Sequence, residues 1–342
     1  MQTAPEKIAQ IAVDVPLSRQ FDYLAPEISR QDIGRRALVP FGRRLVVGII
    51  VGVAERPIDP AFKLKRVQEI FYDVPPLPQA ILKLAQFCSA YYHYPLGQVL
   101  AALLPVRLRR TQPVSALTET RFVLTDAGRN TTADALAKRA LTKHKLLAAL
   151  HAAGSLTHSE IARLSPTANK AAKDFVTAGW LSTLQEPLTS AARNHTLPAS
   201  LNAPPLNAEQ QQALDAIRAT PAGFSAWLLH GVTGSGKTEV YLHLIADLLA
   251  NGGQVLVLVP EINLTPQLEA RFQARFPQTT IVNLHSHLAE VERLKHWLMA
   301  QQGAAQIVLG TRLAVFTPMP ALQLIVVDEE HDGSFKQQDG MR

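Results

Sequence analysis

Along the first hundred residues, short runs of Val and Ile alternate with clusters of Pro, Gly and charged residues. The runs Lys7–Val15, Arg36–Pro40 and Leu45–Ala54 have the composition of β-strands. They follow one another too closely for helices to lie between them, so a small β-barrel or sandwich is favoured over βαβ units. From Pro78–Tyr92 the apolar spacing becomes helical, and Leu96–Leu104 is a second helical stretch.

A different helical pattern occupies the middle of the chain. Lys143–His151 carries its leucines on one helical face, and Thr157 with Glu160 forms a capping box that begins a second short helix. Ala168–Thr177 is a third helix after a tight turn, and a β-hairpin is expected after Gly179. Three helices followed by a hairpin predict a winged helix. Such domains contact DNA or other proteins, and both alternatives stay open.

From Asn207 onward, short apolar runs are followed by helical patterns. Buried strands are predicted at Ala226–His230, Gln254–Pro260, Gln306–Leu309 and Leu322–Val327. Strands of this kind predict an α/β domain with a parallel sheet. The protein is therefore expected to be multidomain. Its predicted parts are a small β-rich domain, a winged-helix domain, a linker rich in Pro, Ser and Thr, and an α/β domain, at residues 1–110, 111–185, 186–206 and 207–342.

Composition narrows the class of protein. Of the 342 residues, 47% are hydrophobic and 18% are charged, which excludes a disordered chain. No apolar run reaches the roughly 18 residues that a bilayer span needs, and Met1–Gln10 lacks the apolar core of a secretory signal. Cys88 is the only cysteine, so neither a disulfide nor a cysteine-rich zinc site is expected in this chain. We expect a cytoplasmic protein.

Charge divides the chain into a basic and an acidic part. Residues 1–110 carry 15 Lys and Arg against 9 Asp and Glu, and residues 111–206 carry 10 against 6. Residues 207–342 carry 9 against 13. The basic part favours a polyanionic partner, nucleic acid before a membrane surface. A solvated basic surface is an equally open alternative.

The sharpest motif follows the predicted strand Ala226–His230. The sequence GVTGSGKT has the GxxxxGK[ST] form of a P-loop in its required strand–loop–helix context. Its glycines let backbone N–H groups turn toward a phosphate at the positive end of the next helix. Lys237 is expected to neutralise the β- and γ-phosphates, and the Thr238 hydroxyl to bind Mg²⁺. The predicted nucleotide-binding residues are Gly231, Val232, Thr233, Gly234, Ser235, Gly236, Lys237 and Thr238.

An acidic motif, DEEH, ends the predicted strand Leu322–Val327. Asp328 is placed to hold Mg²⁺ through water, and Glu329 to orient and deprotonate an attacking water. ATP hydrolysis, with ATP and Mg²⁺ as cofactors, is therefore the predicted chemistry. The predicted catalytic residues are Lys237, Asp328, Glu329 and His331. Parallel strands end at one shared sheet edge, where ligands bind. Residues predicted to track a phosphate backbone along this edge are Thr265, Thr311 and Arg312.

Several sequence blocks together resemble one family of enzymes. The P-loop followed by DEEH is similar to lobe 1, the RecA-like ATP-binding lobe, of a superfamily 2 helicase with a DEAH-type box. The blocks GVTGSGKTEVYL, LVPEINLTPQ, LHSHLAEVER and IVLGTRLAVFTPMPALQLIVVDEEHDGSFKQQDGMR resemble more narrowly the primosomal protein N′ family of bacterial replication-restart helicases. The N-terminal blocks VPLSRQFDYLAPE, LVPFG and AYYHYPLG agree. The resemblance covers nearly the whole chain.

The resemblance implies an ATP-dependent 3′→5′ DNA helicase that recognises stalled or recombination-derived forks and initiates primosome assembly. The partners it implies are forked and single-stranded DNA, primosome proteins and single-stranded-DNA-binding protein. It also implies a monomer associated with the bacterial nucleoid, without a membrane partner.

The first domain of this family captures the 3′ end of the leading strand. The matching residues are Phe21, Asp22, Tyr23, Gly42 and Lys65. An aromatic ring can stack on a terminal base, and a carboxylate can accept a bond from a free 3′-OH while repelling a 3′-phosphate. Without the resemblance, the two aromatic residues would be taken as strand core.

Two further matches concern the helicase lobe. Gln210 matches the family's adenine-reading glutamine. The segment after DEEH resembles the aromatic-rich loop that couples DNA binding to ATP hydrolysis, and Phe335 and Lys336 match it. Met341 stands where the family usually has a second aromatic residue, and methionine is a poorer stacking platform.

The chain ends shortly after DEEH, so lobe 1 is expected to be incomplete. Lobe 2 and the zinc-bearing cysteine-rich insertion of the family are expected only in a longer protein. The 342 residues alone are expected to bind nucleotide weakly and not to unwind DNA. The chain is thus either the N-terminal part of a helicase or a catalytically silent DNA-end-binding module. Another two-lobed DNA translocase is disfavoured by the N-terminal blocks.

Overall fold

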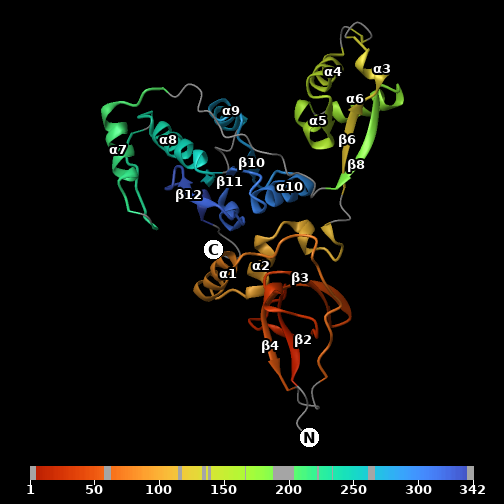
Figure 1. The fold of residues 1–342 in the computed structure, drawn as a ribbon, viewed down its shortest axis with the longest axis vertical. Helices are drawn as coiled ribbons and strands as arrows, with labels where there is room; N and C mark the ends of the chain where they lie inside the picture. The colour runs from red at the N-terminus through yellow and green to blue at the C-terminus, as the bar shows by residue number, and fades with distance from the viewer. Residues whose placement is uncertain are drawn as a thin grey trace. The chain divides into compact units, whose positions relative to one another are not determined.

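The chain folds into two compact units. The computed structural model describes residues 5–57, 63–114, 118–132, 136–137, 140–165, 167–187, 204–221, 223–232, 234–260 and 266–336. One unit is formed by Met1–Thr111 together with Ala192–Arg342, and the other by Gln112–Ala191 (Figure 1). The first unit contains the β-rich domain and the α/β domain.

The β-rich domain is built on a five-stranded antiparallel sheet with the order β2-β1-β4-β3-β5. Its strands are β1 (Glu6–Val13), β2 (Phe21–Leu24), β3 (Arg36–Phe41), β4 (Arg44–Arg56) and β5 (Glu69–Ile70). On β1 the buried residues Ala9, Ile11 and Val13 follow the two-residue period of a strand and point into one core. The predicted strands correspond to β1, β3 and β4, whereas the short strands β2 and β5 were not predicted.

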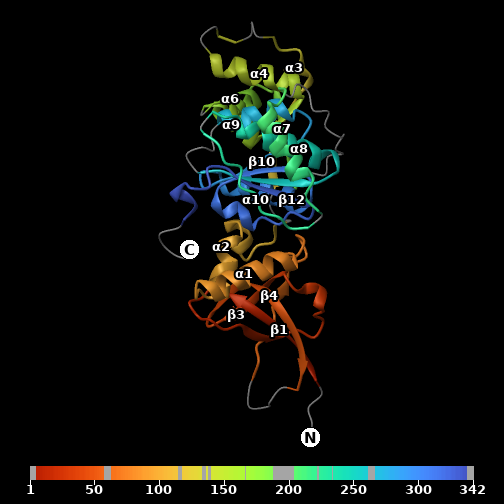
Figure 2. The same cartoon turned by 90° about the vertical axis from the view of Figure 1, so that its left-hand side faces the viewer.

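Helices cover one side of this sheet. They are α1 (Gln79–Tyr91) and α2 (Leu96–Leu103), and the 3-10 turns are η1 (Arg30–Asp32) and η2 (Val106–Arg109). In Figure 2, α1 and α2 lie next to the sheet. A Cβ atom on Gly97 would overlap the Val13 carbonyl, so glycine at this position allows α2 to pack closely on β1.

A buried ion pair joins β3 to the segment between β5 and α1. Arg36 is 3% exposed and donates to both carboxylate oxygens of Asp73, at 2.8 and 2.7 Å. Its second terminal nitrogen donates to the Leu108 carbonyl at 3.1 Å. The same guanidinium lies 4.5 Å from the centre of the Phe71 ring. Because these partners lie 37 and 72 residues away, the pair connects distant parts of the domain.

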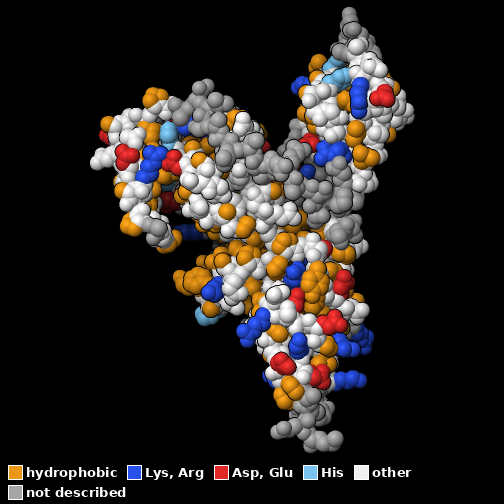
Figure 3. All heavy atoms as spheres, viewed as in Figure 1, with side chains coloured by type: hydrophobic (Ala, Val, Ile, Leu, Met, Phe, Trp, Pro, Cys, Tyr) orange, Lys and Arg blue, Asp and Glu red, His pale blue; other side chains and the backbone are white. Residues whose placement is uncertain are grey.

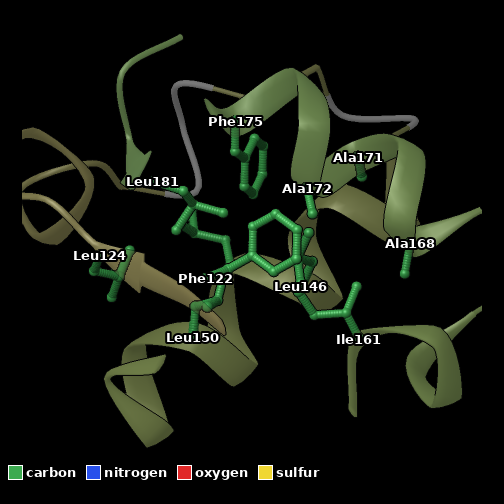
Figure 4. Packing of buried hydrophobic residues seen from close by; sticks show 11 residues of the cluster. Phe122, Leu124, Leu146, Leu150, Ile161, Ala168, Ala171, Ala172, Phe175 and Leu181 are labelled. Carbon is green, nitrogen blue, oxygen red and sulfur yellow. The ribbon is translucent and has the colours of Figure 1, made fainter. Parts of the chain in front are cut away.

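The second unit combines one short helix, three longer helices and a small sheet in its described residues. Its helices are α3 (Asp126–Arg129), α4 (Leu141–Ala153), α5 (His158–Leu164) and α6 (Ala168–Thr177), and its strands are β6 (Thr118–Leu124), β7 (Ser155–Thr157) and β8 (Leu181–Pro187). The three longer helices, α4 to α6, occur where the sequence predicted them, and the capping box at Thr157 and Glu160 is present. Figure 4 shows the core, in which Phe122 from β6 and Phe175 from α6 lie among leucines of α4.

The pairing of β8 differs from the predicted hairpin. In the described residues, β8 pairs antiparallel with β6, in the sheet order β7-β6-β8. Leu124 lies opposite Leu181 at one end of this pairing. The partner strand thus precedes the helices in sequence, a long-range pairing that local turn signals cannot reveal.

The α/β domain contains a four-stranded parallel sheet with the order β10-β11-β9-β12. The strands are β9 (Gln254–Leu258), β10 (Ile281–Leu284), β11 (Ile307–Gly310) and β12 (Leu322–Val327). The helices are α7 (Ala208–Arg218), α8 (Lys237–Ala250), α9 (Pro266–Arg275) and α10 (Glu290–Gln301), with 3-10 turns η6 (Arg312–Phe316) and η7 (Gly333–Phe335). Apolar side chains of α8 and α9 pack against β9 and β11.

The predicted strand at Ala226–His230 is wrong: this segment is not a strand. The side chains of Trp227 and Leu228 are 52% and 73% exposed. Among the described strands, β12 pairs only with β9, and Ile325 on β12 is 46% exposed. A β-strand needs a neighbouring strand that satisfies its backbone N–H and C=O groups. Apolar composition alone was therefore not sufficient to predict the secondary structure of this segment.

Candidate nucleotide and DNA-binding sites

The P-loop leads directly into α8, whose first residue is Lys237. Gly234 and Gly236 have φ angles of +82° and +80°, a conformation that glycine adopts without steric cost. The Lys237 ammonium donates to the carbonyl oxygens of Gly231 at 2.7 Å and Val232 at 3.2 Å. The loop therefore curls around the start of α8, where the first N–H groups have no partner within the helix. This arrangement fits a phosphate group, because both the N–H groups and the ammonium are donors.

Gln210 on α7 lies against this loop. Its side-chain amide donates to the Ser235 carbonyl at 3.0 Å, while its oxygen accepts from the Asn207 N–H at 2.9 Å. A Cβ atom on Gly236 would overlap the Gln210 amide nitrogen. The structure thus places this predicted adenine-reading residue at the P-loop, where it also caps α7.

Tyr241 connects the P-loop helix to the DEEH motif. Its hydroxyl donates to Asp328 Oδ2 at 3.3 Å. Burial, and then the charge of Asp328, raise the pKa of Tyr241 well above its usual value, so the phenol keeps its proton and acts as a donor. Sequence reasoning missed this residue. Its position three residues after Thr238, on the same helical face, is the signal that could have found it.

The hydrogen bond from Tyr241 joins Asp328 to α8, the helix that also carries the other predicted metal ligand, Thr238. Thr238 supplies a hydroxyl and Asp328 a carboxylate, and oxygen atoms of these kinds suit Mg²⁺. The Asp328 N–H donates to the Leu258 carbonyl at 2.9 Å, which fixes the start of the motif beside β9. The residues present therefore fit a magnesium ion.

The next residue of the motif has an unusual backbone conformation. Glu329 has a φ of +51°, in the left-handed region that non-glycine residues seldom occupy. Such a conformation costs on the order of 1–3 kcal/mol and often occurs at functional sites. The Glu329 carboxylate is exposed and lies 3.5 Å from His331 Nε2. The backbone thus turns the second carboxylate of the motif away from the direction of β12.

The sheet edge places Thr311 and Arg312 next to the loop that follows DEEH. The Thr311 N–H donates to the Leu284 carbonyl at 3.1 Å, and the Arg312 guanidinium donates to the Ser334 carbonyl at 3.2 Å. Phe335, adjacent to Ser334, is half-buried in η7, and Lys336 is exposed. The predicted residues Thr233, Thr265 and Met341 lie outside the described residues.

In the β-rich domain, three of the predicted end-binding residues lie around the β3–β4 turn. Gly42, with a φ of +59°, follows Phe41 in this tight turn. The Lys65 ammonium donates to the Gly42 carbonyl at 3.2 Å. Phe21 packs edge-to-face against Phe41, with ring centres 5.0 Å apart. The structure therefore brings Phe21, Gly42 and Lys65 into one region, and Figure 3 shows Lys and Arg side chains projecting from this domain among Asp and Glu.

The other two predicted residues have different surroundings. Tyr23 is 4% exposed, and its hydroxyl donates to the Pro40 carbonyl at 3.3 Å, so it is a core residue that joins β2 to β3. Asp22 lies between two residues that face the core and, by strand alternation, points to the opposite side. Its carboxylate forms an ion pair with Arg56 on β4.

Comparisons with known proteins agree with this architecture. Residues 10–105 match the sequence model of a 3′DNA-binding domain (3′BD), and residues 207–342 match that of a DEAD/DEAH box helicase. The replication restart protein PriA of Haemophilus influenzae is 38% identical over 98% of this chain and 46% of its own length. PriA of Bacillus subtilis is 29% identical over 97% of this chain and 50% of its own length. The Synechocystis protein of the same name is 54% identical over 40% of this chain and 16% of its own.

The chain belongs to the PriA family. The resemblance to the replication-restart helicases is therefore confirmed. The predicted β-rich DNA-binding domain at the N-terminus and the predicted α/β helicase domain with a parallel sheet are confirmed as well. The chain spans about half the length of the Haemophilus influenzae and Bacillus subtilis relatives. In the part of the chain that the structure describes, no helix combines the length and the apolar character needed to cross a membrane.

Proposed function

We propose that this chain is part of an ATP-dependent 3′→5′ DNA helicase of replication restart. It would recognise stalled or recombination-derived forks through the leading-strand 3′ end and initiate primosome assembly. The observation that carries this proposal is the presence, in one chain, of a 3′DNA-binding domain and a helicase domain whose P-loop helix is connected to DEEH by Tyr241.

The nucleotide chemistry follows from the P-loop and DEEH. Bound ATP with Mg²⁺ supplies phosphoryl transfer to water. Lys237 would neutralise phosphate charge, since its present partners are neutral carbonyl groups. Thr238 and Asp328 would hold the metal ion. Glu329 would accept a proton from the attacking water, with the imidazole of His331 close to its carboxylate. Backbone groups of the loop and Gln210 would position the nucleotide.

The DNA end would bind beside the β3–β4 turn. Phe21 would stack on the terminal base, while Gly42 and Lys65 would contact the backbone. Tyr23 would support this surface from the core. Asp22, oriented by its ion pair with Arg56, would accept a hydrogen bond from the 3′-OH. In the helicase domain, the DNA contacts would come from the sheet edge and the following loop, through Thr265, Thr311, Arg312, Phe335 and Lys336.

The remaining parts of the proposal concern the second unit and the partners. Its three helices and small sheet support a winged helix that contacts either DNA or the neighbouring domain. The domain boundaries would be 1–110, 111–185 and 207–342, with a linker at 186–206. Primosome proteins and single-stranded-DNA-binding protein would be partners of a monomer in the bacterial cytoplasm, near the nucleoid. Zinc would bind only in the part of the family's proteins that lies outside the region matched by this chain.

One observation favours a second candidate, a catalytically silent DNA-end-binding module. The Lys237 ammonium is bonded to carbonyl groups of its own loop. The segment before the loop pairs with no strand that the structure describes, and Trp227 is half exposed. A P-loop in this arrangement could bind nucleotide without turning it over.

ATP hydrolysis separates the two candidates. The wild-type chain is expected to hydrolyse ATP faster when DNA is added, and Lys237→Ala is expected to abolish the reaction. If the wild-type chain binds DNA without measurable turnover, the silent module is favoured.

The end-binding claim has its own test. Fork binding is measured with a 3′-OH and with a 3′-phosphate on the leading strand. A preference for the 3′-OH that Asp22→Asn removes would support the role of this carboxylate, and equal wild-type affinities would argue against it.

A further inference from the structure

A cleft of about 210 Å³ lies where the β-rich domain meets the carboxyl edge of the helicase sheet, both within the first unit. On one side it is lined by the segment from α2 to η2, which contributes Arg109. On the other side it is lined by residues that follow β9, β10 and β11, and by Arg293 on α10. Its volume equals that of roughly seven liquid water molecules, which leaves room for a phosphate group with some of its hydration. The carboxyl edge of a parallel sheet is also where ligands of α/β domains bind.

The lining of this cleft is strongly basic. Arg109, Arg293 and Arg312 all contribute to it, together with His285. No Asp or Glu occurs among the described residues that line it. Three guanidinium groups in one concave surface create a positive potential that low-dielectric walls focus. The complementary ligand is an anion.

Neutral groups hold these arginines in place. Arg109 donates twice to the Leu104 carbonyl, at 3.1 and 2.9 Å. Arg293 donates to the carbonyls of His285 and Ser286 at 3.1 and 2.5 Å. These bonds orient the guanidinium groups, and among the described residues neither arginine forms an ion pair with an Asp or Glu.

Two neighbouring arginines, one in η2 and one directly after it, provide a contrast. Arg107 and Arg110 both pair with the carboxylate of Glu290, at 3.2 and 2.8 Å. These two arginines thus share one acidic partner on α10, which offsets part of their charge, whereas the hydrogen bonds of Arg109 and Arg293 end on carbonyls. The segment is therefore docked on the helicase domain by two arginines and presents a third to the cleft.

Burial and two neighbouring charges act on Arg109 in the cleft. Burial, above all, lowers the pKa of Arg109, and the nearby charge of Arg293 acts in the same direction. Asp14 acts in the opposite direction but does not line the cleft. The Nε atom of Arg312 is buried without a hydrogen-bond partner. A bound anion would give this basic lining a balancing charge and would offer an acceptor to the arginines.

We propose that this cleft binds a phosphate group of the DNA backbone, held by Arg109 of the 3′DNA-binding domain and by Arg293 and Arg312 of the helicase domain. The proposal rests on the proposed function, because the strand must pass between the two domains. It adds Arg109 and Arg293 to the DNA contacts expected at Thr311 and Arg312. A phosphate contact shared by both domains would keep the captured strand in register with the motor.

The first test measures binding of the 342-residue chain to a labelled oligo-dT strand as salt is varied. Each lost phosphate contact lowers the slope of log affinity against log salt by about 0.7 for a single strand. We expect Arg109→Gln and Arg293→Gln each to show this decrease, and the lysine variants at both positions to retain the slope. Arg218→Gln is the matched control, since Arg218 is an exposed arginine paired with Asp247 on the far end of α8. Wild-type slopes in both glutamine variants would overturn the proposal.

A second test uses the unaltered chain, because either substitution removes hydrogen bonds that support the fold. Phenylglyoxal modification of arginine is mapped by mass spectrometry with and without saturating oligo-dT. Protection of Arg109 and Arg293 by DNA supports the proposal, and unchanged reactivity overturns it. Protection by inorganic phosphate or free nucleotide, without protection by DNA, would identify a free anion as the ligand and also overturn it.

These outcomes separate this proposal from the proposed function. If the wild-type chain does not bind DNA at any salt concentration, both fail. If it binds DNA with wild-type slopes in the Arg109 and Arg293 variants, only the cleft proposal fails.

Discussion

Asp73→Asn is expected to loosen the β-rich domain far more than the loss of an ordinary surface ion pair. The substitution keeps the shape of the side chain but removes the charge opposite Arg36, whose side chain is 3% exposed. The Arg36 guanidinium would then remain buried with carbonyl and amide partners only, including the Leu108 carbonyl.

The expected size of the effect follows from this burial. Removing one partner of a buried ion pair costs about 3–5 kcal/mol, because the remaining charge stays desolvated. The retained bond to Leu108 and a possible bond to the new amide favour the lower end, about 3 kcal/mol. At 1.4 kcal/mol per factor of ten, this corresponds to roughly hundredfold more frequent opening of the domain.

Hydrogen exchange followed by mass spectrometry measures this opening directly. Peptides from β3 and β4 report the β-rich domain, and peptides from α4 and α6 in the second unit serve as an internal reference. Asp247→Asn is the matched control, because its partner Arg218 and the Asp247 side chain are 43% and 44% exposed. An exposed pair of this kind contributes about 1 kcal/mol at most.

The comparison between the two variants decides the outcome. If β3 and β4 exchange no faster in Asp73→Asn than in Asp247→Asn, the argument from desolvation is refuted. The double variant Arg36→Met/Asp73→Leu provides a second check, because replacing both charges with apolar groups should recover much of the loss.

Three further predictions concern the nucleotide site and the cysteine. Tyr241→Phe removes the hydrogen-bond donor to Asp328. We expect the Mg²⁺ concentration for half-maximal binding of a fluorescent ATP analogue to rise about fivefold, equivalent to about 1 kcal/mol. An unchanged Mg²⁺ dependence would count against the bridging role. Gly236→Ala should abolish binding of this analogue. Gly252 has a similar φ of +75° and open space around its Cβ position, so the control variant Gly252→Ala should lose stability but still bind the analogue. Equal binding by both variants would contradict the steric argument. Burial raises the pKa of Cys88, so its thiol should react with Ellman's reagent at pH 8 only after unfolding, and rapid reaction in the native chain would show that the site is open.

Local sequence signals were sufficient for several helices and for the P-loop, although α3 and α10 were not predicted. The predicted helix Ala168–Thr177 has the same bounds as α6, because its periodicity and its flanking turn residues lie within one short segment. The same holds for the capping box of α5, whose two partners are three residues apart. The GxxxxGKT spacing placed Gly234 and Gly236 where positive φ angles are needed. All these features depend on neighbours within a few residues, so the sequence by itself determined them.

Tertiary structure decided the features that depend on distant partners. The segment at Ala226–His230 has the composition of a strand but no strand beside it in the described residues, and β8 pairs with a strand that precedes three helices. Tyr241 became part of the site only because α8 lies next to the end of β12, which brings Asp328 to its hydroxyl across 87 residues. Arg109 and Arg293 share a cleft only because η2 docks on α10. Hydrogen bonds and charge interactions depend on distances in the folded chain. Local sequence patterns do not show which residues that are far apart in sequence will come close together.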